Sequence, residues 1–251
     1  MIGMSCTDFG ARDPEEVWDE VSKEFAHWEI FSEAKHAVGG FLERFLEKKD
    51  SYDMTYSVHA PICDVNIASL NERMREAAVI DTIITIETAA VMGAETVTVH
   101  PGLYSMAVGG LNERSERLAK QSIRTISRAS EEYGVAVAVE NMPSLSFMLG
   151  RTPEELDALI EGTDLGICFD IGHANTAGRI DEFLERFKGR MANIHIHDNN
   201  GDRDAHLTIG EGNIDFRHAM SKLSGYNGKY IIEAKSLESA ARSKAALETL
   251  L

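Results

Sequence analysis

The chain has 251 residues, 43% of them hydrophobic and 26% charged, which is the composition of an ordinary globular protein. Acidic residues outnumber basic ones by 41 to 25, and the net charge of -16 disfavours nonspecific attraction to nucleic acid or to an anionic membrane. We find no signal peptide and no apolar run long enough to span a bilayer, so no membrane partner is expected.

Cysteine usage and linker composition indicate the compartment and the number of domains. The three cysteines lie far apart and form no CxxC motif, which favours a reducing, cytoplasmic location: Cys6, Cys63 and Cys168. With only 5 prolines and no stretch rich in serine and glycine, the chain lacks a recognisable interdomain linker. We therefore expect a single domain over residues 1–251.

Short β-like runs alternate with helical patterns along the whole chain. The predicted strands cover residues 2–5, 28–31, 54–59, 96–100, 136–140, 165–170, 191–197 and 230–233. The unbroken apolar run at 136–139 is typical of a parallel strand that is covered on both faces. Pro61 and Pro101 follow the third and fourth runs, where a proline cannot continue a ladder of hydrogen bonds.

The helical segments carry start and stop signals. They are predicted at residues 14–25, 41–48, 70–92, 112–133, from 152 onward, 181–187, 216–223 and 237–251. Pro14 and Pro153 stand at first turns, while Gly93 and Gly134 follow the last turns of the two longest segments. Eight strand–helix pairs in about 250 residues predict a single (β/α)8 TIM barrel. The alternative, a doubly wound sheet, would show a glycine-rich phosphate loop after its first strand, and residues 6–10 do not form one.

Metal-binding side chains end six of the predicted strands: His59, His100, Glu140, Asp170, His195 and Glu233. In a parallel barrel these side chains arrive at the same C-terminal mouth. His173, Asp204 and His206 follow in adjacent loops, and imidazoles with carboxylates suit Zn²⁺ or Mn²⁺. Because nine candidates exceed what one ion binds, either two or three ions are held or some of these residues contact substrate.

One ligand choice stays open. His197 shares the parity of His195, so on a strand both side chains point to the same face. Glu29 and Glu33, near the second strand, are further candidates for the mouth.

The motifs resemble those of the xylose-isomerase-like TIM-barrel superfamily, which contains sugar isomerases and epimerases and also endonuclease IV-type repair enzymes. The matching segments are residues 58–61, 99–102, 139–141, 169–174, 195–198, 210–214 and 232–233. The isomerase branch implies one divalent ion held by Glu140, Asp170, His195 and Glu233, with Glu140 and Glu233 as acid/base groups beside a stabilised enediolate. Under this interpretation we expect His173, His197 and Asn141 to contact a sugar or sugar phosphate.

The endonuclease IV branch implies three zinc ions, and all nine corresponding positions carry compatible residues: His59, His100, Glu140, Asp170, His173, His195, Asp204, His206 and Glu233. Ala205, Leu207 and His197 depart from that branch, which has Arg, His and Asn there, and the mouth loops contain few basic residues. We therefore favour a sugar or sugar-phosphate isomerase or epimerase. The alternative is an endonuclease IV-like zinc phosphodiesterase, and only under it is nucleic acid a partner. Another hydrolase, a lyase or a noncatalytic binder on the same scaffold also stays open.

Overall fold

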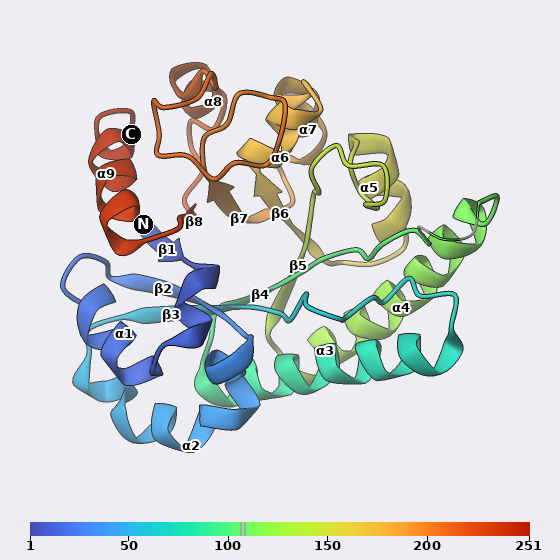
Figure 1. Cartoon of the computed structure of the whole chain (residues 1–251), viewed down its shortest axis with the longest axis horizontal. Coiled ribbons are helices and arrows are strands. Elements are labelled where there is room, and N and C mark those ends of the chain that lie inside the picture. Colours follow the sequence, from blue (N-terminus) through green and yellow to red (C-terminus); the bar gives the residue numbers. More distant parts are fainter. Residues whose placement is uncertain (106, 108) are drawn as a thin grey trace.

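The computed structural model describes residues 1–105, 107 and 109–251, and it confirms the predicted barrel. Eight parallel strands pair in chain order and close between the first and the last (Figure 1). They are β1 (Ile2–Ser5), β2 (His27–Phe31), β3 (Thr55–His59), β4 (Thr96–Val99), β5 (Ala136–Glu140), β6 (Gly166–Asp170), β7 (Met191–Ile196) and β8 (Lys229–Glu233).

Helices surround the strands as an outer layer (Figure 1). They are α1 (Pro14–Val21), α2 (Val38–Lys48), α3 (Glu72–Met92), α4 (Asn112–Tyr133), α5 (Pro153–Ile160), α6 (Ile171–Thr176), α7 (Ile180–Phe187), α8 (Phe216–Lys222) and α9 (Leu237–Glu248). The side chains of Asn71 and Thr152 cap α3 and α5, and Gly93 and Gly134 end α3 and α4 in the left-handed conformation. None of the helices in the described part of the chain is both long and apolar enough to cross a membrane.

The main differences from the predicted elements lie at the ends of strands. β4 and β7 stop one residue earlier than expected, so His100 and His197 lie just beyond their strands. The helix predicted at 14–25 ends at Val21. Four short segments have no counterpart among the predicted elements: α6 and the 3-10 helices η1 (Thr7–Ala11), η2 (Ala34–His36) and η3 (Lys49–Ser51).

The short helix α6 matters for the mouth of the barrel. The carboxylate of Asp170, the last residue of β6, accepts a hydrogen bond of 2.5 Å from the backbone N–H of His173. This cap turns the chain into a helix directly after the strand. As a result the side chain of His173 returns to the mouth one turn after Asp170.

Candidate metal centre

The structure brings all nine predicted ligands together at the C-terminal ends of the strands and divides them into three groups. Within each group, one ligand atom per residue lies within 4.8 Å of the others. We call them the first group (His59, His100, Glu140), the central group (Glu140, Asp170, His195, Glu233) and the loop group (His173, His197, Asp204, His206). Glu140 belongs to two groups, and His197 joins the loop group.

The first group is formed at the ends of β3, β4 and β5. Oε2 of Glu140 lies 3.3 Å from Nε2 of His59 and 2.9 Å from Nε2 of His100. Nδ1 of His59 donates to the carbonyl of Ala60 at 2.8 Å, which leaves Nε2 free to face the carboxylate. This is the arrangement of a metal-bound imidazole, whose second ring nitrogen is held by another acceptor.

The central group lies deepest in the mouth. Nδ1 of His195 is 3.1 Å from Oε1 of Glu140 and 3.1 Å from Oε1 of Glu233. The opposite ring nitrogen, Nε2, is 2.8 Å from Oε1 of Glu29, a carboxylate that is fully buried inside the barrel. Oε2 of Glu29 accepts from the side chains of Ser57, Thr98 and Asn193. Glu29 therefore orients the imidazole of His195 from the interior of the barrel.

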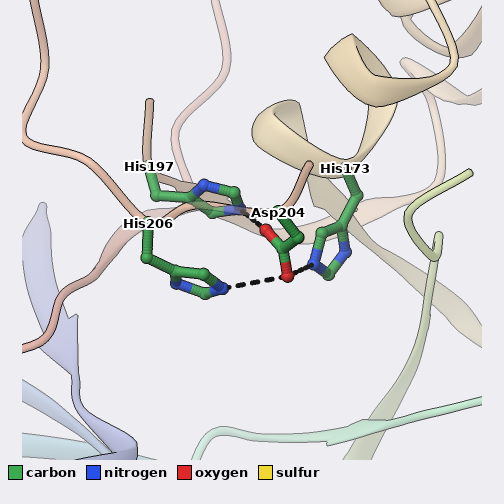
Figure 2. Close-up of side chains that lie close together, drawn as sticks. All are labelled: His173, His197, Asp204 and His206. Atoms are coloured by element: carbon green, nitrogen blue, oxygen red, sulfur yellow. Dashed lines mark hydrogen bonds and ion pairs between the residues drawn. The ribbon is translucent and has the colours of Figure 1, made fainter. Parts of the chain in front are cut away.

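The loop group is drawn in Figure 2, where three imidazoles surround the carboxylate of Asp204. Oδ2 of Asp204 lies 3.3 Å from Nε2 of His173 and 3.1 Å from Nε2 of His206, and Oδ1 lies 3.3 Å from Nε2 of His197. Nδ1 of His173 donates to the carbonyl of Asn141 at 2.8 Å. β7 ends between His195 and His197, so His195 faces the central group, whereas His197 faces the loop group and also lies 3.2 Å from Oδ1 of Asp170.

The loop that carries Asp204 and His206 is tied to its base by Asp198. The carboxylate of Asp198 accepts from the backbone N–H groups of Asn199, Gly210, Gly212 and Ile214, and the backbone of Asp198 pairs with that of Leu207. At Gly212 a β-carbon would overlap this carboxylate, so the glycine is required by close approach. These contacts make the loop a fixed support for its two ligands.

Sequence patterns do not assign specific roles to Glu29 and Asp198. Glu29 is only a general candidate for the mouth, although a carboxylate inside an otherwise apolar strand is a signal of a buried partner. Asp198 lies within residues 195–198, one of the segments that resemble the superfamily, but the resemblance assigns no role to it. Glu33, the other candidate near β2, instead accepts from the backbone of Ile62 and Cys63 at 2.7 Å each and so organises the loop after β3.

Asn141 has a different environment from the one we predicted. We expected it to contact substrate, but it is fully buried and uses both ends of its amide on the backbone of Asp170. Nδ2 donates to the carbonyl of Asp170 at 2.9 Å, and Oδ1 accepts from its N–H at 2.8 Å. The geometry therefore makes Asn141 a support for the end of β6, with no free polar atom for a substrate.

The chemistry of these groups fits divalent ions. Oδ2 of Asp170, Oδ1 of Asp204 and both ring nitrogens of His197 are buried and have no hydrogen-bond partner among the described residues. Buried polar atoms without partners are costly, and cations bound among them would satisfy the two carboxylate oxygens and one ring nitrogen. Cys168 lies near Glu140 and His195, and burial raises the pKa of its thiol well above the usual value.

The carboxylates are held in their charged form. Burial alone would raise the pKa of Glu140, but the imidazoles of His195, His100 and His59 hold it well below its usual value. Burial likewise opposes ionisation of Asp204, and the neighbouring His173 and His206 outweigh it and lower its pKa. Anionic oxygens among imidazole nitrogens are the donor set that Zn²⁺ and Mn²⁺ accept.

Two arginines in loops near the mouth are paired with acidic side chains. Arg151 is 2.8 Å from Glu155, and Arg179 pairs with Glu154 and Glu182. The net charge of -16 also opposes nonspecific attraction to the phosphates of a nucleic acid.

The fold and the site together define a (β/α)8 barrel with a candidate multinuclear metal centre at its mouth. The chain belongs to the xylose isomerase-like TIM barrel family, whose model matches residues 15–250. The uncharacterized protein MJ1311 of Methanocaldococcus jannaschii is 38% identical over 255 residues, which cover 95% of this chain and 86% of that protein.

Named relatives fall on both branches of this family. A solved structure described as a D-tagatose 3-epimerase-like protein is 35% identical with a TM-score of 0.93, covering 99% of this chain and 96% of that chain. A probable endonuclease 4 of Acholeplasma laidlawii is 29% identical over 192 residues, covering 68% of this chain and 63% of that protein.

Proposed function

We propose that the chain is a metal-dependent hydrolase of small phosphate esters, with a sugar phosphate as the substrate class and a centre for up to three Zn²⁺ or Mn²⁺ ions. The observation that carries this proposal is the position of Glu140. Its Oε2 faces His59 and His100, while its Oε1 faces His195. A carboxylate shared in this way between two ligand groups could help to hold two ions, and a pair of ions would stabilise both the attacking and the leaving oxygen of a phosphate ester.

When bound, the ions would polarise phosphoryl oxygens and lower the pKa of an attacking water. The residues of the chain then hold and orient the reactants. Glu233 is the most accessible carboxylate of the central group, with 14% of its side chain exposed, and we place it as the group that takes the proton from the water. His100 and His206, exposed by 21% and 26%, border the opening where the ester would enter.

A small substrate fits the charge of the molecule better than DNA does. The net charge of -16 and the pairing of Arg151 and Arg179 with glutamates oppose the approach of a polyanion. A single phosphate group needs only the local positive charge that bound ions provide. Abasic-site DNA is therefore the less favoured phosphodiester substrate.

A second candidate is the sugar or sugar-phosphate isomerase or epimerase. It is supported by the central group itself, in which Glu140 and Glu233 flank Nδ1 of His195 at equal distances of 3.1 Å. Two carboxylates on either side of one ion could move a carbon-bound proton through an enediolate. The 35% identity to a D-tagatose 3-epimerase-like protein agrees with this candidate.

The deciding experiment supplies the purified protein with Zn²⁺ or Mn²⁺ and three substrate panels. These are sugar phosphates with model phosphodiesters, a DNA duplex with an abasic site, and ketoses in D₂O. We expect phosphate-ester cleavage that Glu233→Gln lowers about 100-fold or more, because the proton acceptor is lost. Glu113→Gln, at a side chain that is 91% exposed, is the matched control and should leave the rate unchanged.

Three results would reject the hydrolase. Deuterium incorporation into a ketose without ester cleavage would establish the isomerase instead, and incision of abasic DNA alone would establish the repair activity. An absence of turnover in all three panels would exclude the proposed reaction and both alternatives.

A further inference from the structure

We infer that His197 is the fourth protein ligand of the loop group, so that this group is coordinatively closed and its ion is structural. The inference rests on the proposed function in one respect: the reaction is taken to occur at the first and central groups. Structural zinc sites are bound by four protein ligands, whereas catalytic sites keep a position open for water or substrate. In the central group Glu233 is assigned to the proton, which leaves three protein ligands and an open position, whereas the loop group offers four protein ligands.

The distances within the loop group match a four-ligand site. A tetrahedral ion with bonds of about 2.0–2.1 Å places its ligand atoms roughly 3.3–3.4 Å from each other. Oδ2 of Asp204 lies 3.3 Å from Nε2 of His173 and 3.1 Å from Nε2 of His206, whereas the distance of 3.3 Å to Nε2 of His197 is measured from Oδ1. Figure 2 shows the stacked rings of His197 and His206 on one side of this carboxylate and the ring of His173 on the other. His197 is thus as close to Asp204 as the other two ligands are.

The state of His197 provides an independent observation. Its side chain is 1% exposed, and neither ring nitrogen has a hydrogen-bond partner among the described residues. An imidazole buried without a partner is unfavourable unless an ion takes one of its nitrogens. Gly172 makes room for the ring, because a β-carbon at that position would overlap it. The surroundings therefore hold the ring of His197 in a fixed position and leave its Nε2 directed at the other members of the loop group.

Contact with substrate is a poor explanation for the same residue. The ring of His206 stacks on that of His197 with centroids 4.0 Å apart and planes 10° apart, and only His206 has an exposed edge. A substrate would have to displace His206 to reach His197. The geometry therefore favours a ligand role for His197 over the substrate contact that we predicted.

The loop that this ion would hold has one strained ligand. His206 adopts a φ of 45°, in the left-handed region that a residue with a side chain rarely enters. Such strain costs about 1–3 kcal/mol and persists only where surrounding interactions compensate for it. Asp198 fixes the base of the loop, and an ion bound by Asp204 and His206 would fix its tip.

The test uses Co²⁺ as a spectroscopic probe, titrated into the chelator-stripped full chain without substrate. We expect three ions per chain, one of them with the strong visible absorption of four-coordinate Co²⁺. In His197→Asn the affinity for one ion should fall by more than about 100-fold, beyond the roughly 10- to 100-fold that an outer-shell change produces, and that absorption should weaken as water enters. His218→Asn, on the surface of α8, is the matched control.

His197→Cys keeps the inference testable if the asparagine variant does not fold. A thiolate is also a zinc-type ligand, so this variant should retain the tight ion and add a sulfur charge-transfer band. Unchanged affinity and absorption in His197→Asn, or fewer than three ions in the native chain, would overturn the inference. Three ions without ester cleavage would instead reject the proposed function and leave the structural ion in place.

Discussion

Single residues behind the ligands determine how the ligands are presented. Each of His59, His173 and His195 directs one ring nitrogen at the centre, while the other is held by a backbone carbonyl or a carboxylate. Such partners fix the ring and its tautomer and make the imidazole a better donor. Among them Glu29 is distinctive, because it is a charged group inside the barrel with a hydrogen-bond network of its own.

Replacing Glu29 by Gln should weaken metal binding without removing a ligand. The amide keeps the size of the side chain but loses the charge that orients His195, and outer-shell changes of this kind cost about 10- to 100-fold in affinity. Competition with a chelator measures the effect on Zn²⁺. The matched control is Glu33→Gln, which should bind Zn²⁺ as the native chain does. Equal Zn²⁺ affinities of the Glu29→Gln and Glu33→Gln variants would contradict the role assigned to Glu29.

Among the strands, helices and loops, the centre depends on how strands end and loops begin. α6 begins immediately after β6 and returns His173 to the mouth, and the loop after β7 is organised around the carboxylate of Asp198. Neither feature follows from the alternation of strands and helices. Both rest on side chains that accept hydrogen bonds from the backbone, which is how irregular segments become rigid.

The loop after β7 should loosen when Asp198 is changed to Asn. In the native chain several backbone N–H groups donate to the carboxylate of Asp198, whereas the amide of the variant offers them one acceptor oxygen and no charge. Hydrogen bonds to charged groups contribute about 1.5–3 kcal/mol each. We expect a loss of about 2–4 kcal/mol in the free energy of unfolding and faster proteolysis within residues 199–215. Asp202→Asn, exposed in the same loop, should change neither property. Equal stability of the two variants would show that Asp198 does not fasten the loop.

Across the molecule as a whole, the barrel concentrates negative charge at one end of an already acidic protein. Glu29, Glu140 and Asp170 are almost fully buried there, with Glu233 and Asp204 closer to the surface. Bound cations would offset this charge and link segments from β3 to β8. The stability of the fold should therefore depend on metal.

Chelation should lower the melting temperature, and added Zn²⁺ should restore it. An ion present at 1,000 times its dissociation constant stabilises the native state by about 4 kcal/mol. Differential scanning calorimetry of the native chain with chelator, and then with excess Zn²⁺, measures the change. A melting temperature that is the same in both conditions would argue against metal binding in the native state.

The amino-acid pattern alone is sufficient to predict the barrel and to single out nine candidate ligands for its mouth. Parallel strands separated by helices must end at one mouth, so chain order assigns six strand-end ligands to it: His59, His100, Glu140, Asp170, His195 and Glu233. His173, Asp204 and His206 follow from their positions in adjacent loops. The pattern does not choose between His195 and His197, because strand parity treats them alike.

The division of these ligands into groups depends on the three-dimensional arrangement of the chain. Which oxygen of Glu140 faces His100, and which faces His195, is set by the stagger of neighbouring strands. The end of β7 at Ile196 sends His197 to the loop group, and the stack on His206 keeps it there. The roles of Glu29 and Asn141 depend on partners that lie far away in the chain, and local pattern carries no information about such contacts.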